Sequence, residues 1–178
     1  MFLDILLIGI ALAMDAFAVT LSSAMTYPNL KGKKRFSLPV AFAVFQGGMP
    51  ILGYFLGCIF SGFLCKYSGI ITCIILLIIG GGMIKDGIKG EDEGEKEFSF
   101  KVLLLLAIAT SIDAFAVGVG FAAMGAEVFS SSLIIAISTL VITTIGLYLG
   151  KFAGEKLGDK SVIIGGLVLV IIGIKSLF

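Results

Sequence analysis

Two aspartates stand at the centres of long apolar runs, where ionised groups are rare. Asp15 lies in LAMDAFAV and Asp113 in TSIDAFAV, and both octapeptides contain Asp-Ala-Phe-Ala-Val. An ionised Asp at the centre of a bilayer costs about 2.5 to 3.5 kcal/mol on insertion scales, so two such groups need a compensating partner. The chemistry that these residues predict is the binding of a cation inside a membrane.

Further oxygen-bearing side chains occur near the centres of the apolar runs. Thr110 precedes Asp113 by three residues, and Gln46 begins the stretch QGGMP, which ends at Pro50. Because a proline inside a helix removes a backbone donor, we expect a broken helix that turns the Gln46 amide and freed carbonyls toward the cation. Thr139 belongs to the matching polar region of a later run, although such hydroxyls more often bond back to their own helix.

These groups form an oxygen-rich ligand set. The chain has no His, and its three cysteines form no CxxC pair, so zinc or haem sites built from those residues are not expected. Carboxylate, amide, hydroxyl and carbonyl oxygens suit Mg²⁺, Ca²⁺ or Mn²⁺ better than Zn²⁺ or Cu⁺. The residues alone do not choose among the three hard cations, and we expect no resident cofactor.

The composition indicates how such a site is positioned. Of 178 residues, 58% are hydrophobic and only 14% are charged, which is too little polar surface for a water-soluble globule. We therefore predict an all-α membrane protein with six transmembrane helices. The expected spans are residues 3–25, 38–63, 69–84, 102–124, 130–150 and 162–177. They leave no room for a soluble catalytic domain, so an enzyme is not expected.

The positive charges predict the orientation of the chain. Eleven of the thirteen Lys and Arg residues fall in the loops after spans one, three and five, and only Lys66 and Lys175 fall on the other side. Because Lys and Arg accumulate in cytoplasmic loops, both termini are predicted to lie outside the cytoplasm. The mixed-charge stretch 89–101 reads as a short cytoplasmic loop.

The apolar runs repeat. Asp15 and Asp113 are 98 residues apart, whereas ILGYFLG and TIGLYLG end on glycines 93 apart, at Gly57 and Gly150. Residues 1–88 and 102–178 therefore each form a three-span unit, joined by the loop 89–101. Since three is odd, the second unit enters the membrane from the opposite face. Inverted repeats of this kind are typical of secondary transporters, whose sites lie at the membrane midplane between the repeats.

The motifs resemble those of the MntP family of manganese efflux pumps, six-span bacterial proteins in the wider LysE-like group of exporters. The resemblance covers essentially the whole chain through MDAFAV, FQGGMPILGYFLG, GGGMIKDG, ATSIDAFAVGVG and IGLYLGKFAG. Two departures stand out. Gly82 lies where some members carry a basic residue, and Gln46 lies where some carry Glu.

The resemblance implies a multi-pass protein of the bacterial plasma membrane that exports Mn²⁺ as its substrate. It implies that Asp15 and Asp113 are essential, with Gln46 nearby and Asp86 as an acidic group at the cytoplasmic end of span three. We expect alternating access with protons as the counter-ion, because the chain has no P-loop for ATP and a divalent cation leaves a dianionic site more easily when charge replaces it. No nucleic-acid partner is expected, and the sequence leaves the oligomeric state open.

Two alternatives remain at this point. One is an exporter of another small solute or cation, as elsewhere in the LysE-like group. The other is a non-transporting sporulation or assembly protein, in which the aspartates would hold helices together by hydrogen bonds.

Overall fold

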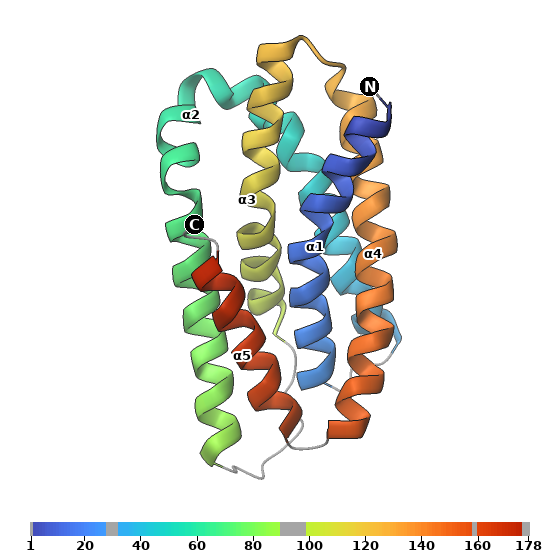
Figure 1. The fold of residues 1–178 in the computed structure, drawn as a ribbon, viewed down its shortest axis with the longest axis vertical. Coiled ribbons are helices and arrows are strands. Elements are labelled where there is room, and N and C mark those ends of the chain that lie inside the picture. Colours follow the sequence, from blue (N-terminus) through green and yellow to red (C-terminus); the bar gives the residue numbers. More distant parts are fainter. Residues whose placement is uncertain (1, 28–31, 90–98, 158–159, 176–178) are drawn as a thin grey trace.

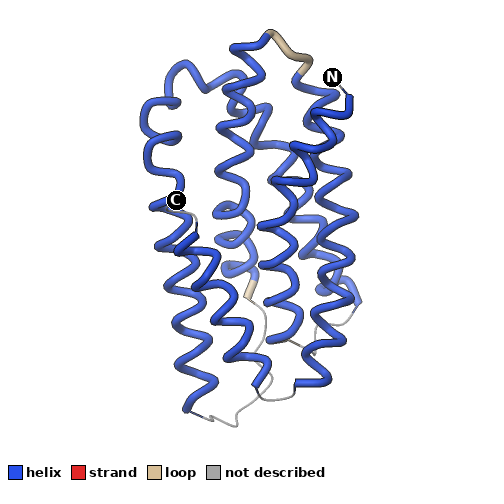
Figure 2. Tube along the Cα trace, viewed as in Figure 1, coloured by secondary structure: helices blue, strands red, loops and turns tan. Residues whose placement is uncertain are grey.

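The computed structural model describes residues 2–27, 32–89, 99–157 and 160–175, all of them helical apart from short caps and one turn (Figure 2). The helices in these ranges are α1 (Phe2–Thr26), α2 (Gly32–Lys89), α3 (Phe100–Met124), α4 (Val128–Leu157) and α5 (Lys160–Lys175). The predicted loop 89–101 lies mostly outside the described residues. The prediction of an all-α protein is confirmed.

The helix α2 has 58 residues and turns back on itself. It runs along the bundle, bends at the far end and returns in the opposite direction (Figure 1). Its first limb contains the apolar segment Phe36–Leu56, and its second limb contains the shorter segment Ile70–Lys85. The two limbs correspond to the second and third predicted spans. The helix continues through Pro39 and Pro50, so the prediction of a broken helix at Pro50 is wrong.

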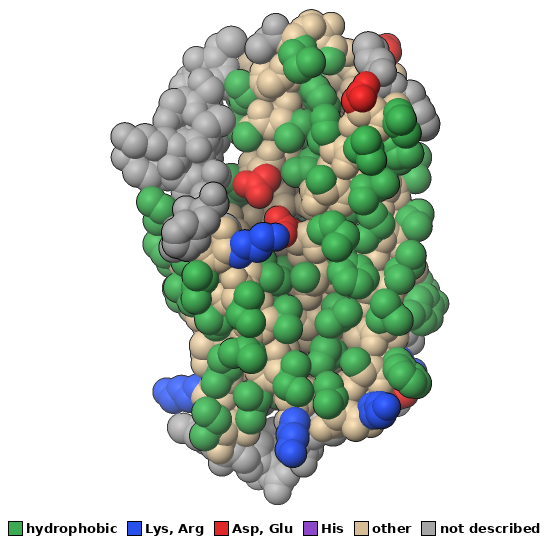
Figure 3. Space-filling model, viewed as in Figure 1, with side chains coloured by type: hydrophobic (Ala, Val, Ile, Leu, Met, Phe, Trp, Pro, Cys, Tyr) green, Lys and Arg blue, Asp and Glu red, His purple; other side chains and the backbone are tan. Residues whose placement is uncertain are grey.

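The outside of the bundle is apolar, as Figure 3 shows for one face. Many large hydrophobic side chains are exposed, among them Ile78 (71%), Val44 (64%) and Phe129 (63%). In a water-soluble protein, an apolar surface of this extent would mark an interaction site. Four segments are long and apolar enough to cross a membrane: Leu3–Thr26, Phe36–Leu56, Phe100–Ala122 and Val128–Leu157. The protein is a multi-pass membrane protein.

A buried core joins all five of these helices. It includes Val19 of α1, Phe42 and Leu76 of the two limbs of α2, Leu106 of α3, Leu147 of α4 and Leu169 of α5, each at most 1% exposed. Because lipid is as apolar as the core, this packing depends on close fit rather than on exclusion of water.

Glycines allow the closest approaches. A Cβ at Gly53 would overlap the carbonyl of Phe115, and one at Gly118 would overlap that of Pro50, so the first limb of α2 lies directly against α3. A Cβ at Gly150 would overlap the carbonyl of Leu21 in the same way, where α4 packs against α1.

The ends of α3 follow local sequence signals. The Ser99 hydroxyl accepts a hydrogen bond from the backbone N–H of Lys101 at the N-terminal end. Gly125 ends the helix with φ of 64°, a left-handed conformation in which glycine has no steric penalty. These caps fix the limits of the helix that carries Asp113.

Candidate cation site

The two aspartates occupy the same position in helices of the same length. α1 and α3 each have 25 residues, and in each helix 13 residues precede the aspartate and 11 follow it. At a rise of about 1.5 Å per residue, each carboxylate is roughly 17 to 20 Å from either end of its helix. Neither Asp15 nor Asp113 can therefore reach the water beyond the helix ends by extending its side chain.

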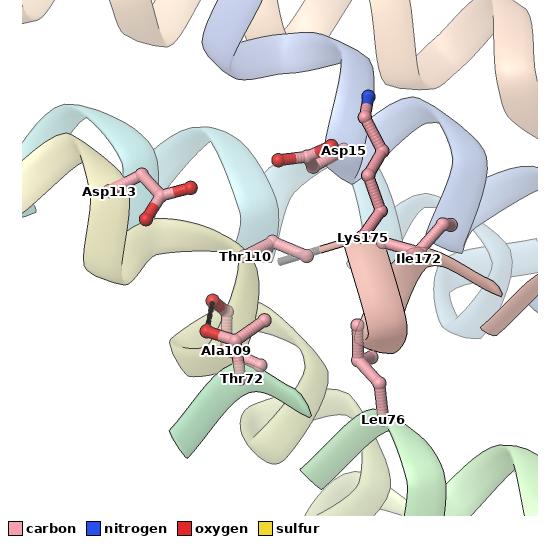
Figure 4. A pocket seen from close by; sticks show the side chains of 8 residues that line it. All are labelled: Asp15, Thr72, Leu76, Ala109, Thr110, Asp113, Ile172 and Lys175. Atoms are coloured by element: carbon pink, nitrogen blue, oxygen red, sulfur yellow. Dashed lines mark hydrogen bonds between the residues drawn. The ribbon is translucent and has the colours of Figure 1, made fainter. Parts of the chain in front are cut away.

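Both aspartates open into one cavity of about 230 Å³. Asp15 is half-buried and Asp113 is exposed. Figure 4 shows the carboxylate of Asp113 directed across the cavity toward that of Asp15. Side chains from α1, the second limb of α2, α3 and α5 complete the lining: Asp15, Thr72, Leu76, Ala109, Thr110, Asp113, Ile172 and Lys175.

Two threonines line the cavity, and the hydroxyl of each donates a hydrogen bond to a backbone carbonyl. The Thr72 Oγ1 donates to the carbonyl of Ala109 at 3.0 Å, which ties the second limb of α2 to α3. The Thr110 Oγ1 donates to the carbonyl of Leu106 one turn earlier in α3, also at 3.0 Å. Each oxygen retains lone pairs that can accept a bond from water or coordinate a cation. The sequence reasoning identified Thr110 but missed Thr72, which no motif marks.

Gln46 does not line this cavity. It is fully buried, and its Nε2 donates to the carbonyl of Thr110 at 2.8 Å and to that of Leu12 at 3.3 Å. The amide therefore links α1 to α3 through their backbone carbonyls instead of facing the cavity, which corrects the orientation predicted for it. Its Oε1 is buried and accepts no hydrogen bond from the described residues.

Thr139 is not brought to the cavity, and Asp86 cannot be placed relative to it. Thr139 is fully buried in α4, and its Oγ1 has no hydrogen-bond partner among the described groups. Asp86 lies near the C-terminal end of α2, and its side chain is outside the described residues. Of the six predicted site residues, the structure gathers Asp15, Asp113 and Thr110.

A basic residue that the sequence reasoning assigned to the outer surface also lines the cavity. Lys175 is the last residue of α5, and this end of α5 reaches only the middle of the bundle (Figure 1). Sequence reasoning missed it because the sixth span was drawn as far as residue 177. No motif in the sequence marked Lys175 as a cavity residue.

The cavity can hold a hard cation only with help from water or carbonyls. Among the described residues, no group of three His, Cys, Asp or Glu side chains stands together. If each carboxylate supplies one oxygen, two carboxylates and two hydroxyls give about four ligands, fewer than the six or more that Mg²⁺ and Ca²⁺ take, so a bound hard cation would retain part of its hydration shell.

Comparison with known proteins identifies the family. The family described as "Putative manganese efflux pump" matches residues 29–177. Proteins of the same description from Methanosphaera stadtmanae and Methanobrevibacter smithii are 41% and 42% identical, covering 98% of this chain and 98% and 96% of theirs. One from Bifidobacterium adolescentis is 39% identical over 100% of this chain and 96% of its own. No solved structure matches the chain. With the family matched over residues 29–177 and such relatives along nearly its whole length, the protein belongs to the MntP family.

Proposed function

We propose that this protein exports Mn²⁺ from the cytoplasm as a secondary transporter, with Asp15 and Asp113 holding the cation. The observation that carries the proposal is that two carboxylates at equal depth in two different helices line one cavity. A lone buried acid is explained by a hydrogen bond to a neighbouring helix. Neither aspartate has a hydrogen bond or an ion pair within the described part of the chain, which favours a cation as their partner.

The choice of Mn²⁺ comes from the family, and the ligand chemistry is compatible with it. The relatives are described as manganese efflux pumps. Carboxylate, hydroxyl and water oxygens suit Mn²⁺ as well as Mg²⁺. The ligand atoms therefore do not distinguish Mn²⁺ from Mg²⁺, and measurement of transport decides between these two ions.

Six spans in two inverted repeats, residues 1–88 and 102–178, are part of the proposal, and glycine contacts support it. Gly53 packs against Phe115. Gly146, which is 93 residues after Gly53, packs against Phe17, which is 98 residues before Phe115. These are the offsets that relate the two halves of the sequence, so one contact is the repeat copy of the other.

A second pair of contacts has the same relation. A Cβ at Gly80 would meet Leu169, and one at Gly173 would meet Leu76. Gly173 follows Gly80 by 93 residues, and Leu169 follows Leu76 by 93 residues. Such reciprocal contacts are what a two-fold axis between the halves requires. They support the second limb of α2 and α5 as the third span of each repeat.

Alternating access follows from this symmetry. In an inverted repeat, each half can adopt the conformation of the other, and the exchange opens the midplane site to opposite sides. Gln46 bridges the two repeats, because its Nε2 donates to the carbonyls of Leu12 and Thr110. These two residues are 98 positions apart and so occupy equivalent places in the two repeats. An exchange of conformation between the repeats would therefore change the hydrogen bonds of Gln46.

The proposed orientation places both termini outside the cytoplasm. Lys side chains gather at the end of the bundle opposite the N-terminus (Figure 3). Lys101 lies in the first turn of α3 there, and Lys151 and Lys156 lie near the end of α4. Because Lys and Arg mark the cytoplasmic side, this end is assigned to the cytoplasm.

Protons are the proposed counter-ions. A divalent cation that leaves two carboxylates exposes two like charges in a poorly solvated site, and both conditions favour protonation of a carboxyl group. Protons that enter as Mn²⁺ departs would keep the site near neutrality in both directions of the cycle.

The test is Mn²⁺ flux into proteoliposomes with an imposed pH gradient. Asp15→Asn and Asp113→Asn should each reduce flux at least about 100-fold, because each removes half of the charge that offsets the cation's lost hydration. Asp4→Asn, which removes the same charge near the start of α1, should transport like the wild type. Full flux in either central variant would refute the assignment.

Two further arms separate the alternatives. Inhibition of Mn²⁺ flux by Mg²⁺, Ca²⁺, Zn²⁺ or amino acids measures the substrate range. A solute that is itself transported faster than Mn²⁺ would replace Mn²⁺ as the proposed substrate. Flux that ignores the pH gradient would remove the proton from the proposal and leave Mn²⁺ export standing. Absence of flux for all of these solutes would favour a non-transporting protein.

A further inference from the structure

Lys175 lies at the depth of the two aspartates and shares their cavity. Figure 4 shows its side chain rising from the end of α5 beside Asp15. α5 has 16 residues, a length of about 24 Å at 1.5 Å per residue, which is less than the roughly 30 Å of a bilayer core. The Lys175 side chain therefore reaches the cavity from the end of α5, where it is exposed.

The three charges act on one another without being locked together. Lys175, Asp15 and Asp113 line the same cavity, where the ammonium attracts the carboxylates and the carboxylates repel each other. Within the described ranges, no ion pair of 4.0 Å or less joins Lys175 to either carboxylate, so the ammonium is not fixed to either of them. Lysine carries a compact charge on a flexible four-carbon stem, and it can approach or leave the carboxylates without movement of the helix.

Mn²⁺ and the ammonium group compete for the two carboxylates. Two carboxylates and one ammonium leave one net negative charge, whereas adding a divalent cation makes the cluster net positive in a poorly solvated place. Like charges a few ångströms apart repel strongly where water is scarce. The ammonium must therefore withdraw when the divalent cation enters.

We propose that Lys175 is a tethered counter-cation, which partly neutralises Asp15 and Asp113 when the site holds no Mn²⁺ and is displaced when Mn²⁺ binds. The inference rests on the proposed function and adds a regulator of affinity to it. Competition from the ammonium weakens Mn²⁺ binding and, by returning as the ion departs, speeds release. Lys175 thus sets the balance between capture and turnover.

A purely structural role makes a different prediction. A positive charge in the last turn of a helix is stabilised by the helix dipole, and Lys175 occupies that turn of α5. Loss of such a charge would lower thermal stability and leave the affinity for Mn²⁺ unchanged. Lys160, at the opposite end of the same helix and exposed, provides a matched control for the loss of one charge.

The experiment compares Lys175→Gln, Lys175→Met, Lys175→Arg and Lys160→Gln with the wild type. Mn²⁺ binding is measured by titration calorimetry on the purified proteins, and Mn²⁺ flux is measured in proteoliposomes. Both neutral variants at Lys175 should bind Mn²⁺ about fivefold or more tightly and show a lower maximal flux. Lys175→Arg and Lys160→Gln should stay within about twofold of the wild type in binding, since each retains a charge at position 175.

Unchanged or weaker binding in the neutral variants would overturn the inference. Using two of them, one polar and one apolar, guards against a variant that does not fold, and helical content by circular dichroism identifies such a case. The proposed function fails separately, since its failure is the absence of Mn²⁺ flux in the wild type. A wild type that transports Mn²⁺, together with neutral variants that match it, removes only the role of Lys175.

Discussion

Two aspartates, two threonines and one lysine line one cavity, and each side chain comes from a helix that is held by other contacts. The Thr110 hydroxyl illustrates the difference between holding and binding. Its bond to the Leu106 carbonyl lies within α3, so it contributes little to joining the helices. Because Thr110 lines the cavity, we expect its oxygen to be available to a bound ion.

This difference predicts a separation of binding from stability. Thr110→Val keeps the shape of the side chain and removes one oxygen, so Mn²⁺ binding should weaken about three- to tenfold while the free energy of unfolding changes by less than about 1 kcal/mol. Thr143→Val is the matched control, because Thr143 is buried and its Oγ1 bonds back to Thr139 at 2.6 Å outside the cavity. Titration calorimetry and thermal unfolding measure the two effects. Equal weakening in both variants would remove Thr110 from the site.

At the scale of the elements, backbone contact sets the geometry around the aspartates. The first limb of α2 touches α3 through Gly53 and Gly118, and both contacts lie within two turns of Asp113. A methyl group at either glycine would push the two helices apart. Small residues at such crossings are the usual means of close approach between helices in membranes.

Gly118→Ala should therefore destabilise the protein by about 1 to 3 kcal/mol, the range for overpacking of a fitted interior. Gly48→Ala is the control on the same limb of α2, because a Cβ there meets no atom within 4 Å. That change should be neutral or stabilise by up to about 1 kcal/mol, since alanine favours helix. Thermal unfolding in detergent distinguishes the two. Similar melting temperatures for both would show that α3 moves aside freely.

At the scale of the whole molecule, the lysine-rich end of the bundle and the turn between α3 and α4 lie on opposite sides of the membrane in the proposed orientation. Phe100 begins α3 at the first end, and Glu127 stands in the turn at the other. The helix between them has 25 residues, about 37 Å, which exceeds the bilayer core.

Cysteine labelling in intact cells tests this orientation. In a background without the native cysteines, Glu127→Cys should react with a membrane-impermeant thiol reagent, whereas Phe100→Cys should react only after the membrane is opened. The reverse labelling pattern would place the lysine-rich end of the bundle outside the cytoplasm and would contradict the proposed orientation.

The sequence by itself determined the class, the four long spans, and the two central aspartates, because hydrophobicity over about 20 residues and an isolated charge within it are local properties. It did not determine where Gln46 and Lys175 point. The QGGMP stretch predicted a broken helix with the Gln46 amide turned toward the cation. Instead, the amide donates to carbonyls on α1 and α3, and α2 remains helical through Pro50. Lys175 was counted with the outer loops.

Only the tertiary structure decided those positions, for a physical reason. A side chain's partner depends on which helices lie beside it, and residues 46 and 110 or 15 and 175 are brought together by packing that no local pattern records. Thr72 entered the cavity lining in the same way, through a hydrogen bond to Ala109 on another helix.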